Sequence, residues 1–132
     1  MKRKFVVDAG PLALFFAGHK EVRKYFEMMY SGSAELYVNE VNLAEFLYNY
    51  ILKFGKEVAL TRYRQVRSSP IRVVSPDDKL TERAAMLKAN HKGLSLADAY
   101  LIATAEEVSG EIITTDSLVK EVSGVKTVLI EF

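Results

Sequence analysis

The 132-residue chain has no cysteine, which excludes disulfide bridges and metal sites built on thiolates. It also lacks any apolar run of about 18 residues, the length that a membrane-spanning helix needs. Its first residues, Met1 to Lys4, lead directly into a short strand pattern instead of the apolar core of a signal peptide. No internal repeat, linker or low-complexity segment divides the sequence. We therefore expect one cytoplasmic domain over residues 1–132 that makes no contact with a membrane.

The composition is that of an ordinary globular protein, but the charge is unevenly distributed. Hydrophobic residues make up 49% of the chain and charged residues 27%, which provides enough apolar material for one core. The formal net charge is only +1. Against the single acid Glu57, however, residues 53–72 carry six basic residues: Lys53, Lys56, Arg62, Arg64, Arg67 and Arg72. Such a stretch is either a solvated helix face or a track for phosphate groups.

Short apolar strands alternate with helical patterns along the whole chain. Strands are expected at residues 5–7, 35–38, 71–74, 112–115 and 126–130. Helices are expected at about 11–17, 20–31, 40–54 and 56–68, then from residues 75–78 to 88, from 95 to 108, and briefly after residue 116. This alternation predicts an α/β fold with a mostly parallel sheet covered on both faces. In such folds the ligand crevice lies beyond the carboxyl ends of the strands, where the strand order reverses.

The helix after Gly93 is apolar on almost every side, yet it contains an acid. A helix of this kind belongs in a protein interior, and Asp98 lies one turn before Leu101 and Ile102, where an unpaired charge is costly. One explanation is a capping box, with Ser95 as the N-cap and Asp98 at the third helical position. The other explanation is a functional role that Asp98 shares with acids elsewhere in the chain.

Three further acids follow the predicted strands. Asp8 comes directly after the first strand, Asp116 after the fourth, and Glu45 in the second turn of the helix after the second. Each has a local alternative: an Asx-turn for Asp8, an N-cap for Asp116 and a solvated flank for Glu45. Together with Asp98 at one sheet edge, these carboxylates would raise one another's pKa values unless a cation compensates them. A set of oxygen ligands suits Mg²⁺ or Mn²⁺ rather than zinc.

Four segments resemble the motifs of the PIN-domain ribonucleases, in order and spacing, over the whole chain. They are Phe-Val-Val-Asp8, Val-Asn-Leu-Ala-Glu45, Leu-Ser-Leu-Ala-Asp98-Ala-Tyr-Leu-Ile-Ala-Thr-Ala and Ile-Ile-Thr114-Thr-Asp116. The branch that the chain resembles most is that of the VapC-type toxins of toxin–antitoxin pairs. The resemblance implies a PIN-like three-layer α/β fold, with a five-stranded parallel sheet in the order 3-2-1-4-5 and helices on both faces.

The resemblance also implies an activity and a site. Carried over by motif, Asp8, Glu45, Asp98 and Asp116 are the catalytic acids that bind one or two divalent metal ions, and Thr114 is a supporting hydroxyl. The implied activity is a Mg²⁺- or Mn²⁺-dependent endoribonuclease that hydrolyses RNA phosphodiester bonds, as the toxin partner of an antitoxin protein. One metal ion can lower the pKa of a bound water, and a second can stabilise the leaving oxygen.

One position departs from the family pattern. Many members have Ser or Thr two residues after the first acid, where this chain has Gly10. A polar contact to metal-bound water or substrate is then missing or replaced by a backbone N–H. Gly10 is the feature that favours the alternative function, a catalytically inactive PIN-like module that binds RNA or protein. A phospho-receiver module is a third possibility, but it needs an acidic pair after strand one, where only Asp8 stands.

Two expectations concern partners. Arg62, Arg64 and Arg67 are the candidate RNA-binding residues of the basic stretch. Four aromatic residues of the third and fourth helices exceed what one small core readily holds: Phe46, Tyr50, Phe54 and Tyr63. Because the family resemblance implies homodimers, we expect an isologous dimer that uses these two helices.

Overall fold

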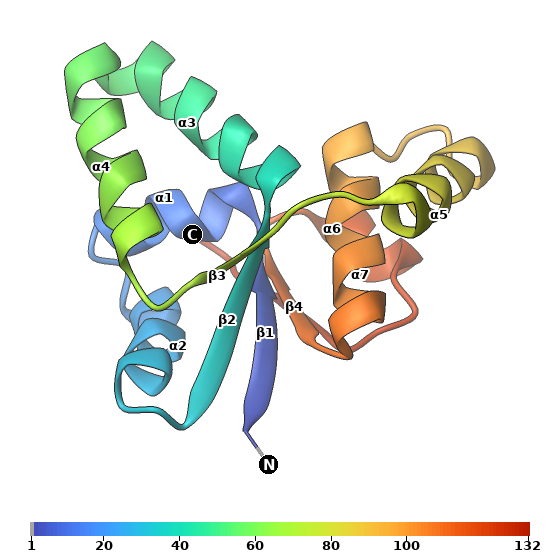
Figure 1. Ribbon diagram of the computed structural model, residues 1–132, viewed down its shortest axis with the longest axis horizontal. Helices are drawn as coiled ribbons and strands as arrows, with labels where there is room; N and C mark the ends of the chain where they lie inside the picture. The colour runs from blue at the N-terminus through green and yellow to red at the C-terminus, as the bar shows by residue number, and fades with distance from the viewer. Residues whose placement is uncertain (1) are drawn as a thin grey trace.

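Five parallel strands form one sheet in the order β3-β2-β1-β4-β5, in a computed structural model that describes residues 2–132 (Figure 1). The strands are β1 (Arg3–Val7), β2 (Ala34–Asn39), β3 (Arg72–Val74), β4 (Glu111–Thr114) and β5 (Thr127–Leu129). Every neighbouring pair is parallel. All five strands lie within two residues of their predicted positions, and the predicted strand order is confirmed.

Helices connect the strands as the sequence pattern predicts. They are α1 (Ala9–Phe16), α2 (Lys20–Tyr30), α3 (Glu40–Phe54), α4 (Lys56–Ser68), α5 (Asp78–Asn90), α6 (Leu96–Val108) and α7 (Ser117–Val122). The start of α1 differs from the prediction. This helix begins at Ala9 instead of Pro11, because Asp8 is its N-cap and accepts a hydrogen bond from the Ala9 N–H at 2.7 Å. Within residues 2–132, no helix is long and apolar enough to cross a membrane.

The central strand β1 separates two hydrophobic cores. Phe5 and Val7 belong to a core shared with α1, α2, α3 and α4, whereas Val6, between them, belongs to a core shared with α5, α6 and α7. The three side chains are fully buried, as expected for a parallel sheet covered on both faces. Figure 1 shows the two groups of helices on opposite sides of the sheet. The predicted three-layer arrangement is therefore confirmed.

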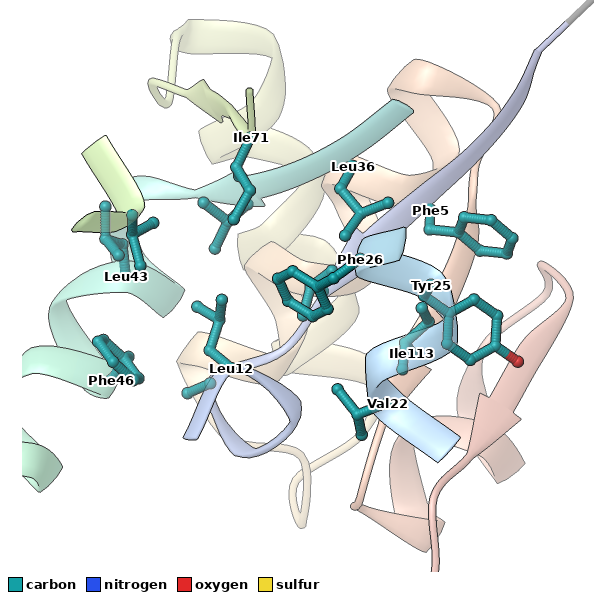
Figure 2. Close-up of a cluster of buried hydrophobic side chains, with 14 of the residues drawn as sticks. Phe5, Leu12, Val22, Tyr25, Phe26, Leu36, Leu43, Phe46, Ile71 and Ile113 are labelled. Atoms are coloured by element: carbon teal, nitrogen blue, oxygen red, sulfur yellow. The ribbon is translucent and has the colours of Figure 1, made fainter. Parts of the chain in front are cut away.

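The first core absorbs most of the aromatic residues. Figure 2 shows Phe5, Phe26 and Phe46 with the aliphatic side chains around them. Phe16, Phe46, Tyr50 and Phe54 form a ladder of neighbouring rings across α1 and α3, with successive centroids 5.9, 5.1 and 4.6 Å apart. The expectation that Phe46, Tyr50, Phe54 and Tyr63 exceed one core is wrong for Phe46 and Tyr50, which are only 1% and 8% exposed. Tyr63 is partly buried and packs against the same core. Of the α3 aromatics named for a dimer, Phe54 alone is exposed, at 49%.

Helices α3 and α4 form an antiparallel pair that extends beyond the sheet (Figure 1). The turn between them is Gly55, whose φ of 89° lies in the region that glycine adopts without strain. Ala59 and Val66 anchor α4 on the core, and its other residues are largely open to solvent. Of the basic residues of α4, Lys56, Arg64 and Arg67 are exposed and Arg62 is partly buried.

Two buried asparagines tie α3 to α6 and so fix the spacing of the helices that carry Glu45 and Asp98. Asn39 caps α3 by accepting from Val41 N–H at 2.8 Å, and its amide donates to Thr104 Oγ1 at 2.9 Å. One turn later, the Asn42 amide donates to the Ala97 carbonyl at 3.0 Å. Because a buried polar group without its partner costs roughly 1–3 kcal/mol, these bonds favour a single arrangement of the two helices.

Candidate active site

The strand order reverses between β1 and β4, and this switch point brings two of the predicted acids together. Asp8 follows β1 directly, and its backbone N–H donates to the Ile113 carbonyl of β4 at 3.0 Å. Asp116 follows β4 after one intervening residue. In parallel α/β sheets, ligands bind beyond the carboxyl ends of the strands at such a point.

The Thr114 side chain connects the two acids. Its hydroxyl donates to Asp8 Oδ2 at 2.7 Å and accepts from the Asp116 backbone N–H at 3.1 Å. The other oxygen of Asp8 is held by Ala9 N–H, and Asp116 Oδ1 accepts from Leu118 N–H at 2.9 Å, as the N-cap of α7. Both carboxylates are therefore fixed in direction by short local bonds.

Asp98 lies in the first turn of α6, the helix that Ser95 caps, and its side chain also faces the other acids. Its backbone N–H donates to Ser95 Oγ at 3.0 Å, so the predicted N-cap of α6 is confirmed. Its carboxyl is nearly buried, at 7% exposed, and lies close enough to Asp116 for the two side chains to share a hydrogen bond. The two explanations that the sequence left open are thus compatible.

Glu45 completes the group from the opposite side. It is half-buried on α3, one turn after Asn42, and faces the charges of Asp8 and Asp116. A pocket of about 340 Å³ is lined by all four acids together with Ala9, Gly10, Asn49, Gly93, Ser95 and Thr115. No lysine or arginine is among these lining residues, so within the described chain the pocket contains carboxylates without a compensating cation.

Burial, and to a lesser extent the neighbouring charges, raises the pKa values of Asp8, Glu45 and Asp98. Burial raises the pKa of Asp98 to about 8, reinforced by the hydrogen bond with Asp116 and by the charges of Asp8 and Asp116, while Ser95 opposes the shift. Burial is also the main cause of a raised pKa at Asp8, where the bonds from Thr114 and Ala9 oppose it. At Glu45, burial and then the charges of Asp8 and Asp116 raise the pKa.

The donor chemistry fits a hard divalent cation. Carboxylate oxygens are the ligands that Mg²⁺ and Mn²⁺ prefer, and a cation would remove the mutual repulsion that raises these pKa values. Across residues 2–132, however, no three acidic or histidine side chains converge as the ligands of a single ion. The four acids therefore line a common pocket without forming a closed coordination sphere. This suits Mg²⁺, which keeps several of its waters and takes few protein carboxylates.

The three candidate RNA-binding arginines do not share one surface. Arg62 stacks over the Phe16 ring at 5.0 Å and lines a groove of about 410 Å³ that shares Ala9, Gly10 and Asn49 with the acidic pocket. Arg67 instead forms an ion pair with Glu40 at 2.6 Å. Arg64 is exposed and lines neither cavity. The structure thus brings one of the three close to the pocket.

Sequence reasoning missed two polar residues that line the pocket, Asn49 and Thr115. Asn49 lies one turn after Glu45 on α3, and helical spacing could have indicated it. Thr115 stands between two residues already singled out, Thr114 and Asp116. The sequence signals Thr115 only indirectly, through Gly10. Glycine is unfavourable within a helix, so its presence in the first turn of α1 suggests that another group lies close to this position.

Comparisons with known proteins agree with this geometry. The model of the PIN domain family matches residues 5–125. A search of curated proteins gives no match. Among solved structures, the chain is similar to one of VapBC2 from Rickettsia felis bound to a DNA fragment from its promoter. The TM-score is 0.76 and the identity 14%, and the match covers 97% of this chain and 99% of that one.

Two more structures illustrate the range of the similarity. DNA-bound VapBC from Salmonella typhimurium gives a TM-score of 0.73 at 17% identity, covering 96% of this chain and 97% of that one. Mycobacterium tuberculosis VapC20, described as a toxin that cleaves the sarcin–ricin loop, gives a TM-score of 0.65 at 20% identity. That match covers 83% of this chain and 86% of VapC20. At these identities the likeness establishes a shared fold.

The raised pKa of Asp98 predicts how the stability of the metal-free protein depends on pH. Because this pKa lies near 8 in the folded state against 3.8 for the free side chain, the folded protein holds a proton that the unfolded chain has lost. The free energy of unfolding therefore falls as the pH rises through this window, by at most about 1.4 kcal/mol per pH unit. Urea unfolding in EDTA, at several pH values across the window, measures this slope.

Asp98→Asn should flatten the slope, because an amide does not titrate and carries no charge against Asp8 and Asp116. Asp78→Asn is the matched control, since Asp78 is exposed at the start of α5. It should keep the slope of the parent protein. A slope that is equally steep in Asp98→Asn and in the parent would show that Asp98 is not the group that holds the proton.

Proposed function

This chain belongs to the PIN-domain family, and from that membership we propose that it is a metal-dependent endoribonuclease that hydrolyses RNA phosphodiester bonds. The observation that carries the proposal is the convergence of Asp8, Glu45, Asp98 and Asp116, from four separate elements, on one pocket at the switch point of the sheet. Nuclease activity is typical of the family. The choice of RNA as substrate is supported by the description of one structural neighbour as a toxin that cleaves the sarcin–ricin loop.

The proposed roles follow from the contacts of each residue. A bound Mg²⁺ or Mn²⁺ would supply charge neutralisation at the phosphate and an acidified water as the nucleophile. Asp8 and Asp116, fixed by Thr114 and by their capping bonds, would hold the ion in a defined place. Asp98 would bind as the carboxylate after losing its proton, and Glu45 would approach from the side of α3. Thr114 is a positioning residue, because its hydroxyl is already engaged by both neighbours.

We also propose that the protein acts as the toxin of a toxin–antitoxin pair. Several similar structures are of such complexes, including VapBC from Salmonella typhimurium and a toxin–antitoxin complex from Klebsiella pneumoniae. A cognate antitoxin is then the expected protein partner.

RNA would reach the pocket along the groove between α1, α3 and α4. Lys53 and Arg62 line this groove, and neither is in an ion pair within residues 2–132. Arg67 and Arg72 are less suitable, because they are neutralised by Glu40 and Glu35, and Arg64 does not line the groove. We propose Arg62 as the main phosphate contact of the sequence-predicted set, with Arg64 and Arg67 in lesser roles.

Cleavage of RNA tests the proposed activity. With Mn²⁺, the purified protein should cut total bacterial RNA into discrete fragments, and EDTA should stop the cutting. Asp8→Asn, Glu45→Gln, Asp98→Asn and Asp116→Asn should each lower the rate at least about 100-fold, the upper range for residues that only support a metal ligand. Asp78→Asn should keep full activity. RNA that is bound but left intact by the parent protein with Mn²⁺ would favour the inactive binding module.

The salt dependence of RNA binding tests the place of Arg62. Each lost phosphate contact lowers the slope of log affinity against log salt by about 1. Arg62→Gln should therefore flatten the slope by this amount, whereas Arg67→Gln is the matched control and should change it little, because Glu40 already neutralises that charge. Filter binding at several salt concentrations gives both slopes. If Arg62→Gln leaves the salt slope of RNA binding unchanged, Arg62 does not contact a phosphate of the RNA.

A homodimer remains a prediction, and the exposed face of α3 is the surface we propose for it. Tyr48 and Leu52 lie one turn apart there and are 56% and 76% exposed. Light scattering at micromolar concentration should give the mass of two chains. Leu52→Glu should give the mass of one, and Tyr30→Glu, at an exposed residue at the end of α2, should leave the dimer intact. A monomeric parent protein would contradict the prediction.

A further inference from the structure

Gly10 and Thr115 share one small space at the rim of the acidic pocket. A Cβ atom built on Gly10 would lie only 2.6 Å from Thr115 Oγ1, closer than two such atoms can approach. The next contacts, to Cγ2 and Cβ of the same threonine, would be 3.4 and 3.6 Å. The Thr115 hydroxyl therefore stands where a side chain at position 10 would begin. Any residue other than glycine at this position would have to displace it.

The two adjacent threonines are differently engaged. Thr114 is fully buried, and its hydroxyl both donates to Asp8 and accepts from Asp116. Thr115 is partly exposed and lines the pocket, and among residues 2–132 its hydroxyl has no hydrogen-bond partner. A hydroxyl that faces a polar pocket without a partner in the chain is free to donate to a ligand.

A second donor lies beside this hydroxyl. The Gly10 N–H belongs to the first turn of α1, where backbone N–H groups have no partner within the helix. No other group of the described chain accepts from it. The Thr115 hydroxyl lies on the side of Gly10 where a side chain would stand, so this residue and that hydroxyl are neighbours. Two neighbouring donors at the start of a helix suit an anionic oxygen.

We propose that the Thr115 hydroxyl, together with the Gly10 N–H, binds a non-bridging phosphate oxygen of the RNA in the acidic pocket. The proposal rests on the proposed nuclease function and gives Gly10 a positive role. The hydroxyl that other family members carry on the residue two after the first acid comes here from the junction of β4 and α7. Thr115 thus supplies the hydroxyl that Gly10 lacks, and the site keeps a hydroxyl that can contact the phosphate.

Binding of a small phosphate ligand tests the proposal without relying on cleavage. Adenosine 5′-monophosphate offers a phosphate but no internucleotide bond, and adenosine is the control without a phosphate. In calorimetric titrations with Mn²⁺ present, Thr115→Val, which keeps the shape but removes the hydroxyl, should weaken binding of the monophosphate about 10-fold or more. Thr115→Ser keeps the hydroxyl and should stay close to the parent protein. Thr81→Ala, at an exposed threonine of α5, controls for an unrelated loss of a hydroxyl.

Substitutions at Gly10 test the shared space. Gly10→Ala should lose affinity for the monophosphate as Thr115→Val does, because the added methyl displaces Oγ1. In the Thr115→Ala background, Gly10→Ala should not lower the affinity for the monophosphate any further, because Oγ1 is already absent. The double variant should also melt at a higher temperature than Gly10→Ala alone, because the methyl no longer clashes with Oγ1. Gly10→Ser in the Thr115→Ala background returns a hydroxyl to the pocket and should recover most of the lost affinity.

The outcomes separate this proposal from the proposed function. If the parent protein and Thr115→Val bind the monophosphate equally well with Mn²⁺, the proposal is wrong and the nuclease function stands. If Thr115→Val weakens binding of Mn²⁺ alone, the hydroxyl serves the metal site and the phosphate contact is also wrong. If the parent protein fails to bind Mn²⁺ and to cut RNA, the proposed function falls, and this inference falls with it.

Discussion

Repulsion among the carboxylates at the switch point is the constraint on which the rest of the site depends. Asp8, Glu45, Asp98 and Asp116 line one pocket. Burial is the main cause of the raised pKa values of Asp8, Glu45 and Asp98, and the charge of Asp116 adds to all three shifts, joined by that of Asp8 at Glu45 and Asp98. Such an arrangement persists only if the surrounding structure fixes it. The fixing groups are the Thr114 hydroxyl between Asp8 and Asp116 and the two buried asparagines that hold α3 against α6. The sheet and both cores thus keep the four acidic side chains close to one another.

Helix capping is what makes this crowding tolerable. The three aspartates all lie at helix N-termini: Asp8 and Asp116 are N-caps, and Asp98 is in the first turn of α6. At these positions the helix dipole and the free N–H groups stabilise a carboxylate by roughly 0.3–1 kcal/mol each. The same three residues therefore meet local needs of the helices and present their remaining oxygens to the pocket. A position at a helix N-terminus therefore does not argue against a role in the pocket.

Much of this could be predicted from the sequence, because it depends on local patterns. The positions of the strands and helices follow from apolar periodicity and caps. The helix predicted to begin within residues 75–78, for example, is capped by Asp77, which accepts from Leu80 N–H at 2.9 Å. The family resemblance supplied the strand order and the four acids. What failed depends on contacts between distant segments. The pairing of Arg67 with Glu40, 27 residues earlier, and the burial of Phe46 and Tyr50 against α1 are invisible to a linear pattern. The close approach of Thr115 to Gly10 is of the same kind.

The central claim is that the four acids form one site for a divalent metal ion. It is tested most directly by the free energy of unfolding of the parent protein and of Asp98→Asn, each with EDTA and with Mn²⁺. In EDTA at neutral pH the variant should be about as stable as the parent, because the pKa of Asp98 is raised to about 8, so that its carboxyl is already protonated there, and the amide is uncharged too. At a hundredfold excess of Mn²⁺ over its dissociation constant, the parent should gain about 2.7 kcal/mol and the variant should lose most of that gain. Equal gains in the two proteins would contradict the account.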